Sequence, residues 1–147
     1  MIKNLYLFLI VFFSINLSAQ KLKGDELVGT WIVGNSKAKI NIYKNGSSFN
    51  GKIVWLKEPT YSDGKPKIDK NNPDVAKQKQ TLIGLDLLKD FVFDDGHWDN
   101  GTIYDPENGK TYKCKITYRE GKLDVRGYIG FSLIGRTDVW FRCSDIK

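Results

Sequence analysis

The stretch TYKCKITY, residues 111–118, alternates apolar and polar side chains without a break. Tyr112, Cys114, Ile116 and Tyr118 fall on one side of an extended chain, and threonine and lysine occupy the other side. Strict alternation over a run of this length is typical of a β-strand that buries one face. The segment therefore predicts antiparallel sheet as the basis of the fold.

The same alternation recurs along the chain, as in KAKINIY at residues 37–43. Turn sequences such as KNGS, DDG, ENG and REG separate the alternating runs. Asn-Gly and Asp-Gly tolerate the positive φ angles that tight hairpins require. The pattern predicts eight short strands, at residues 29–33, 38–43, 48–56, 87–93, 97–104, 111–118, 123–128 and 136–143.

Eight short strands joined by hairpins indicate an all-β fold. We expect one domain, residues 21–147, because a 147-residue chain is too short for two domains with well-packed cores of their own. A sandwich would suit the pattern, but a single antiparallel up-and-down β-barrel removes every exposed strand edge. One long loop, residues 57–80, breaks the regular spacing, and loops of this length are commonly lids or mobile segments. Within it we expect a short helix around residues 73–79, with Asn72 as its cap and Pro73 in its first position.

The first 20 residues have the pattern of a signal peptide. Lys3 precedes an apolar run at residues 5–17, and small polar residues follow it. That run of about 13 residues is shorter than the roughly 20 that a membrane-spanning helix needs. We therefore expect an exported protein, periplasmic or secreted, that does not span the membrane after cleavage. It is not expected to be a lipoprotein, because no cysteine follows the apolar run.

The charge pattern argues against nucleic-acid binding. Residues 1–20 contain one lysine and no acid, so the remaining chain carries (23 − 1) − 17 = +5. Its basic residues are scattered, whereas nucleic-acid binding usually needs a clustered patch.

No catalytic, metal-binding or cofactor-binding residues can be assigned. His97 is the single histidine, and the Cys/His spacing of a metal site is absent. Export permits a disulfide between Cys114 and Cys143. A simple meander would separate them by two strand spacings, about 10 Å, beyond the roughly 7 Å that a disulfide spans. Separate thiols are therefore favoured. The disulfide is the alternative if Cys143 lies beyond the end of the last strand.

The segment RGYIGFSLIGRT, residues 126–137, is rich in glycine and arginine. A phosphate-binding glycine loop follows a strand and begins a helix, but here a strand lies on each side. We interpret its glycines as corner or bulge positions.

Four motifs together resemble one bacterial family of exported proteins, domain of unknown function 2147. They are GTW at residues 29–31, GKIVWL at 51–56, DPENGKTYKCKI at 105–116 and LDVRGYIGFSLIGRTDVW at 123–140. The family also has an Asp/Pro-containing insert, matched here by NNPD at residues 71–74. Some members carry a cysteine pair in that insert. This chain lacks it, so no redox or metal role of the insert is implied.

The early G-x-W motif, with an arginine near the last strand, also resembles lipocalin and avidin-type barrels. The resemblance implies that Trp31 closes one barrel end and that an arginine packs across its ring. Arg136 and Arg142 are the candidates, and we favour Arg136.

These features lead first to a non-enzymatic barrel that binds a small apolar or amphipathic ligand. A filled barrel that binds a protein or an acidic glycan through its basic loop is the alternative. An enzyme that uses Arg126, Arg136 and His97 is the third hypothesis. The ligand-binding candidates are all aromatic: Trp55, Trp98, Tyr112, Tyr118, Tyr128 and Trp140.

Overall fold

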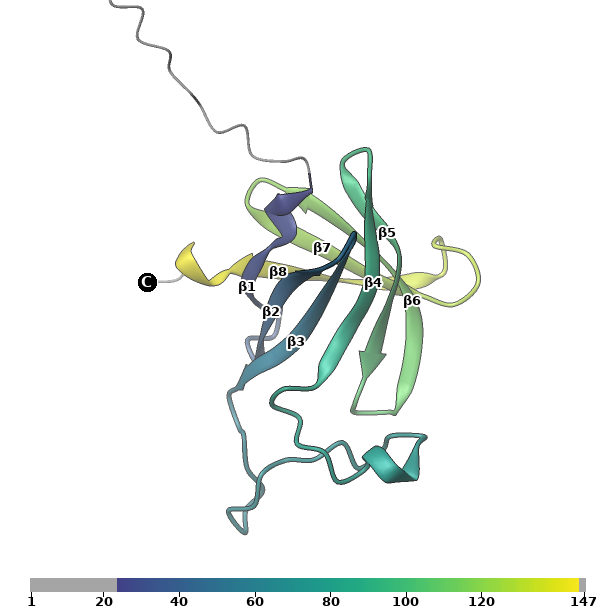
Figure 1. Cartoon of the computed structure of the whole chain (residues 1–147). Helices are drawn as coiled ribbons and strands as arrows, with labels where there is room; N and C mark the ends of the chain where they lie inside the picture. Colours follow the sequence, from purple (N-terminus) through teal and green to yellow (C-terminus); the bar gives the residue numbers. More distant parts are fainter. Residues whose placement is uncertain (1–23, 146–147) are drawn as a thin grey trace, which may run out of the picture.

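The computed structural model describes residues 24–145, which form a closed barrel of eight antiparallel strands (Figure 1). Three short 3₁₀ helices accompany the strands: η1 (Asp25–Leu27), η2 (Val75–Lys77) and η3 (Cys143–Asp145). The strands are β1 (Gly29–Ile32), β2 (Ala38–Asn45), β3 (Ser48–Leu56), β4 (Asp86–Asp94), β5 (His97–Asp105), β6 (Lys110–Arg119), β7 (Lys122–Tyr128) and β8 (Gly135–Arg142).

Each strand pairs with the next along the chain, which gives the predicted up-and-down order. The prediction of an all-β barrel is therefore confirmed, and the predicted strand bounds agree with the observed ones to within one or two residues. The barrel closes where β1 meets β8, through the pairs Trp31 with Arg142 and Ile32 with Phe141.

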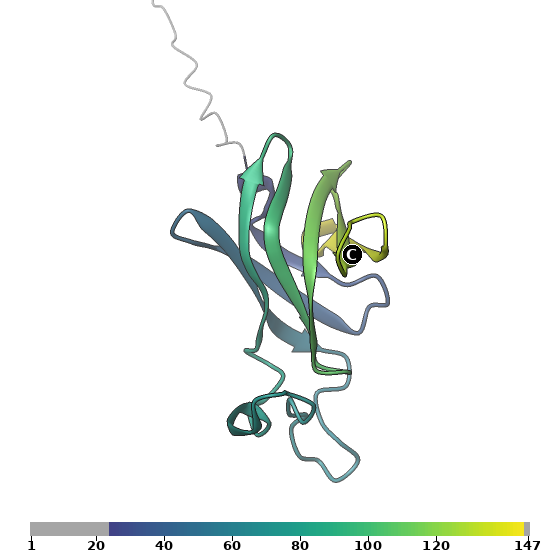
Figure 2. The ribbon, with the colours of Figure 1, turned by 90° about the vertical axis from the view of Figure 1, so that its right-hand side faces the viewer.

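The connections between strands differ strongly between the two ends of the barrel (Figures 1 and 2). At one end, tight hairpins join β2 to β3, β4 to β5 and β6 to β7. Positive φ angles at Gly46, Gly96 and Gly121 permit these turns. The long β3–β4 loop and the β7–β8 loop lie at the other end. We call the hairpin end the closed end and the other end the mouth.

The predicted helix in the long loop is a single 3₁₀ turn, η2, and its cap differs from the prediction. The Asp74 side chain accepts the hydrogen bond from the Ala76 amide at 3.1 Å. Asn72 instead accepts a hydrogen bond from the Asp74 amide at 2.9 Å. Two Asx turns, at Asn72 and Asp74, thus hold the chain where one helix cap was expected.

The two cysteines are free: Cys114 is buried on β6, and Cys143 lies in η3 beyond the last strand. The predicted signal peptide, residues 1–20, lies outside the described residues. Among residues 24–145 no helix is long and apolar enough to cross a membrane.

Candidate ligand-binding cavity

At the closed end, two tryptophan side chains are hydrogen-bonded to the segment that precedes β1. The Trp31 indole donates a hydrogen bond to the Leu27 carbonyl at 2.9 Å, and the Trp98 indole donates to the Gly24 carbonyl at 3.2 Å. Both indoles are buried, so these bonds satisfy donors that would otherwise be costly inside the core. The chain entering β1, including η1, therefore seals this end.

Arg142, on β8, packs across the Trp31 ring at 4.1 Å from the ring centroid. Its guanidinium donates hydrogen bonds to the carbonyls of Val28 at 3.1 Å and Glu26 at 2.5 Å. Gly29 has a φ of 134°, and a Cβ there would lie 2.6 Å from a guanidinium nitrogen of Arg142. The glycine of the G-x-W motif is thus needed both for its backbone angle and for the space that the arginine occupies.

The preference for Arg136 in this role is wrong. Arg136 pairs with Gly127 near the start of β8, whereas Trp31 pairs with Arg142 at its end. A strand advances about 3.3 Å per residue, so six residues separate the two arginines by roughly 20 Å. Arg136 lies at the mouth, where it lines the cavity described next.

A cavity of about 1510 Å³ extends from the middle of the barrel to the loops at the mouth. Its deepest walls are buried side chains of four strands: Ile40, Ile53, Val125 and Trp140. Further apolar side chains continue these walls toward the mouth: Val33, Ala38, Leu56, Leu82, Leu87 and Ile103. The inward-facing residues thus fill the closed half of the barrel but leave the other half hollow.

The rim of the cavity is polar and carries both signs of charge. Its acidic residues are Glu58, Asp105, Glu107 and Asp138. Glu58 pairs with Lys67 at 3.4 Å, and the Asp138 carboxylate accepts hydrogen bonds from the Trp140 indole and the Gly34 amide. The basic residues of the rim are Lys37, Lys57, Lys67, Lys70 and Arg136. Within residues 24–145 no salt bridge is formed by Arg136.

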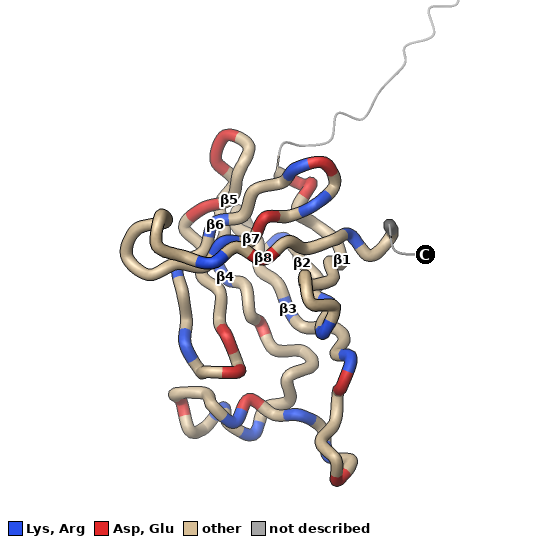
Figure 3. Tube along the Cα trace, turned by 180° about the vertical axis from the view of Figure 1, so that it is seen from behind, with Lys and Arg blue, Asp and Glu red and all other residues tan. Residues whose placement is uncertain are grey.

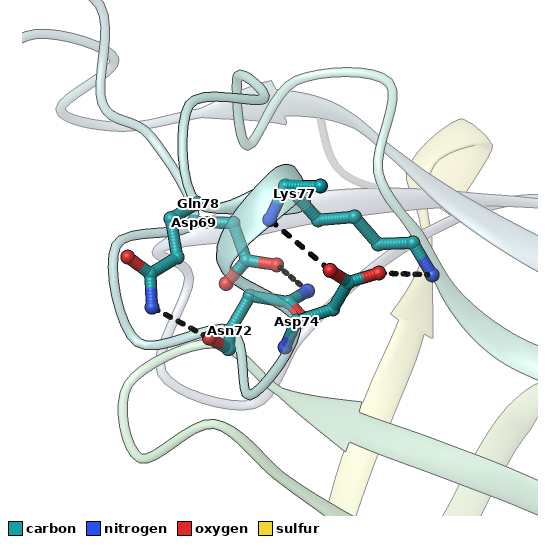
Figure 4. Close-up of polar contacts among 6 residues, drawn as sticks. Asp69, Asn72, Asp74, Lys77 and Gln78 are labelled. Atoms are coloured by element: carbon teal, nitrogen blue, oxygen red, sulfur yellow. Dashed lines mark hydrogen bonds and ion pairs between the residues drawn. The ribbon is translucent and has the colours of Figure 1, made fainter.

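The long loop contains a buried carboxylate, that of Asp69, which faces Asn72 within the loop (Figure 4). It accepts hydrogen bonds from the Asn72 amide and the Tyr104 hydroxyl, both at 2.7 Å. Burial, followed by the hydrogen bond to Asp69, raises the pKa of Tyr104 to about 12, so the hydroxyl keeps its proton and remains a donor. The loop is thus held against β5.

A second anchor joins the long loop to the β5–β6 hairpin. The Asn71 side chain donates hydrogen bonds to the carbonyls of Pro106 at 3.0 Å and Glu107 at 2.8 Å. A Cβ on Gly109 would lie 2.0 Å from the Asn71 carbonyl oxygen, so only glycine permits this approach. The NNPD and DPENG motifs, distant in sequence, therefore form one contact at the mouth.

The predicted ligand-binding aromatics divide into three groups. Tyr112, Tyr128 and Trp140 line the cavity. The Tyr118 ring packs edge-on against Trp31, with 6.5 Å between ring centroids, and the buried Trp98 ring packs against Phe93 and Phe49. These two belong to the closed end.

Trp55 lies outside the cavity. A register shift between β2 and β3 turns it outward opposite Lys39, whose ammonium lies 5.1 Å from the ring centroid. Simple alternation would have directed it inward. The sequence carries no signal for this bulge, which explains the misplacement.

The three residues of the enzyme hypothesis do not form one site, because His97 lies apart from the two arginines, which are on neighbouring strands at the mouth. His97 starts β5 at the closed end, where its imidazole lies 3.2 Å from the Asp99 carboxylate. Arg136 lies at the mouth, and Arg126 binds the β7–β8 loop. Within the described part of the chain, no group of three His, Cys, Asp or Glu side chains is placed to hold a metal ion.

The family assignment rests on a match between residues 29–142 and the family described as "uncharacterized protein conserved in bacteria (DUF2147)". The chain belongs to this bacterial family. The resemblance inferred from the four sequence motifs is therefore confirmed, and the match spans all eight strands of the barrel. No curated protein matches the chain.

Among solved structures, the DUF2147 barrel is similar to protein HP1028 from the human pathogen Helicobacter pylori, described as belonging to the lipocalin family. The TM-score is 0.70 at 21% sequence identity, over 81% of this chain and 84% of that chain. Identity at this level shows a shared lipocalin-like fold. A fold of this type, closed at one end and hollow at the other, is compatible with small-molecule binding.

Proposed function

We propose that the protein is exported and binds a small amphipathic molecule in the cavity, without catalysis. The observation that supports this most directly is the form of the cavity: aliphatic walls in the barrel continue into a charged rim. An apolar tail would replace water along those walls, which contributes about 0.8 kcal/mol per buried CH₂ group. The polar end of the molecule would stay at the rim.

The rim supports a preference for an anionic head group. Arg136 lies at the rim without a carboxylate partner among residues 24–145, whereas the carboxylate of Asp138, two residues along β8, already accepts two hydrogen bonds. An incoming carboxylate, sulfonate or phosphate would meet a guanidinium that can bind it through paired hydrogen bonds.

The alternative, a filled barrel acting through its basic loop, has less support. The barrel is hollow at its mouth, and three lysines of the loop already pair with loop acids: Lys65 with Asp63, Lys67 with Glu58 and Lys77 with Asp74. These pairs reduce the positive charge that the loop offers to a partner.

Binding is tested with two fluorescent probes of similar size, the anionic anilinonaphthalene sulfonate and the neutral phenylnaphthylamine. Ile103→Trp places a larger side chain on the cavity wall and should weaken binding of both probes by about tenfold or more. Val92→Trp adds the same indole at an exposed position of β4 and is the matched control. Equal affinities in the two variants, with both folded, would contradict a ligand site in the barrel.

The preference for an anionic head group has its own test. Arg136→Gln should weaken binding of the sulfonate probe by about threefold to tenfold and leave the neutral probe unchanged. An equal effect on both probes would show that Arg136 acts by shape rather than by charge. Native mass spectrometry of the protein taken from its own periplasm would then identify the molecule.

A further inference from the structure

The β7–β8 loop, residues 129–134, exposes its apolar side chains to solvent at the mouth. Phe131 and Leu133 are 79% and 90% exposed, and Ile129 and Ile134 are each 71% exposed. Scattered exposed apolar residues are ordinary on protein surfaces, but a contiguous group of four large ones marks an interaction site. The loop contains no charged residue. We refer to residues 129–134 as the apolar loop.

The apolar loop is held in this exposed conformation by Arg126 on β7. Its guanidinium donates hydrogen bonds to the carbonyls of Ser132 at 2.6 Å and Leu133 at 3.1 Å, and to the Thr137 hydroxyl at 2.9 Å. The Ile134 amide closes a turn by donating to the Phe131 carbonyl at 3.0 Å. The backbone is thus internally bonded while the apolar side chains at its tip remain uncovered. Figure 1 shows the loop extending away from the barrel wall.

From these contacts we propose that the apolar loop inserts into an anionic lipid surface and so places the mouth of the cavity against the membrane. Apolar side chains on a membrane-associated segment bury themselves about 5–10 Å into the boundary between head groups and acyl chains. Basic residues beside the segment attract anionic head groups over a longer distance. The apolar loop has both features, because Arg126 and Arg136 stand at its base.

The charge around the loop complements an anionic surface. Figure 3 shows Lys and Arg where β7 and β8 meet the loop, and an uncharged tip beyond them. The nearest acids on the two strands are engaged elsewhere: Asp124 pairs with Arg119, and Asp138 accepts hydrogen bonds from the Trp140 indole and the Gly34 amide. The base of the loop therefore carries two guanidinium groups next to an apolar tip, and the one acid close to them on β8 is Asp138.

The size of the loop favours a lipid surface over a protein partner. A stable protein interface buries about 20–30 residues on each side, whereas the exposed apolar group is confined to six residues at one tip. A lipid surface needs no shape complementarity, and a few inserted side chains suffice. Ile129 and Ile134 also line the cavity, so the apolar loop supplies part of the cavity wall at the mouth. An amphipathic ligand, if the proposed function holds, could pass along it.

The first test measures binding of the full folded chain to vesicles of phosphatidylethanolamine with phosphatidylglycerol by flotation. The double variant F131S/L133S should lower the partition coefficient by about tenfold or more, because two large apolar side chains no longer enter the lipid. Val75→Ser is the matched control, since Val75 is 75% exposed on the long loop, outside the apolar loop. Unchanged binding of F131S/L133S would overturn the proposal.

The second test locates the inserted residue. The fluorescence of the new indole in Phe131→Trp, taken as the difference from the unchanged chain, should be quenched by vesicles that contain brominated lipids. The new indole in Val75→Trp should not be quenched. Absence of additional quenching at position 131 would overturn the proposal. Partitioning that is equal for phosphatidylcholine vesicles would overturn the assignment to anionic lipid.

Two further measurements distinguish lipid insertion from self-association of the apolar loop and from ligand binding in the cavity. Sedimentation without lipid tests for a second copy as the occupant: a dimer that F131S/L133S abolishes, with no vesicle binding by the original chain, would overturn the proposal.

Binding of the soluble probes without vesicles is expected to be unchanged in F131S/L133S. Loss of vesicle binding in F131S/L133S with retained probe binding therefore supports the membrane role. If the original chain binds vesicles but not the probes, only the proposed function is contradicted.

Discussion

The two ends of this barrel use the same strands and have opposite properties. At the closed end, tight hairpins bring aromatic rings together, and Trp31 is covered by Arg142 and bonded to Leu27. At the mouth, the connections are longer, and aliphatic walls face an open space. We therefore expect most of the stability to come from packing in the closed half, which leaves the mouth available for a binding site.

The largest loss of stability is expected for Trp31→Ala, at the closed end. The substitution removes a fully buried indole, and with it the stacking surface of Arg142 and the donor to the Leu27 carbonyl. We expect a loss of about 3–5 kcal/mol in the free energy of unfolding, measured by urea denaturation. Trp55→Ala, at the half-exposed outward position, should cost far less. Similar losses in both variants would contradict the role of the closed end.

A matched pair of isoleucines tests the two halves directly. Ile116→Ala removes a fully buried side chain in the closed half and should cost about 2–5 kcal/mol. Ile103→Ala removes a side chain that already borders the open cavity, so less than about 2 kcal/mol is expected. Urea denaturation of both variants gives the comparison. Equal losses would mean that the mouth half is packed as tightly as the closed half.

The anchor of the long loop should affect stability only locally. Asp69→Ala leaves the Tyr104 hydroxyl and the Asn72 amide without their acceptor, a cost of about 1–3 kcal/mol. Because the anchor lies outside the core, we expect faster hydrogen exchange in residues 67–80 and little change in the strands. Asp63→Ala, whose carboxylate forms an exposed pair with Lys65 in the same loop, is the control. Exchange that rises equally throughout the barrel would contradict a local anchor.

The smallest effect concerns pH. Burial raises the pKa of the Cys114 thiol from its usual value near 9 to about 12. Above pH 9 the unfolded chain releases a proton that the folded protein retains, so stability falls as pH rises toward 12. The free energy of unfolding should fall by about 1.4 kcal/mol between about pH 8 and about pH 10. Urea denaturation at several pH values measures this change. Cys114→Ala should flatten this dependence, and an unchanged slope would contradict a buried thiol.

The strands were predictable because their signal is local. Alternation and Asn-Gly or Asp-Gly turns fix where a strand begins and ends, and the predicted segments 48–56 and 111–118 match β3 and β6 closely. Closure into a barrel followed from the number of strands and the absence of other elements to cover their edges.

The site was less predictable because it depends on contacts between distant segments. Whether Arg136 or Arg142 covers Trp31 depends on the register between β8 and β1, which no local pattern encodes. Trp55 was misplaced because a bulge reverses its direction. The buried position of Asp69 had no signal, since an aspartate in a polar loop is ordinarily exposed.

The strands β1 and β8 lie side by side and antiparallel, so the beginning of the first strand and the end of the last strand meet at the closed end. Neighbouring strands are separated by about 4.8 Å, a distance that a short peptide linker can bridge. The barrel is thus suited to circular permutation. New termini could be opened at Gly64, an exposed turn in the long loop where an added side chain would meet open space. Such a permutant of residues 24–145 would keep every strand pair of the barrel and would place its new ends in the long loop at the mouth.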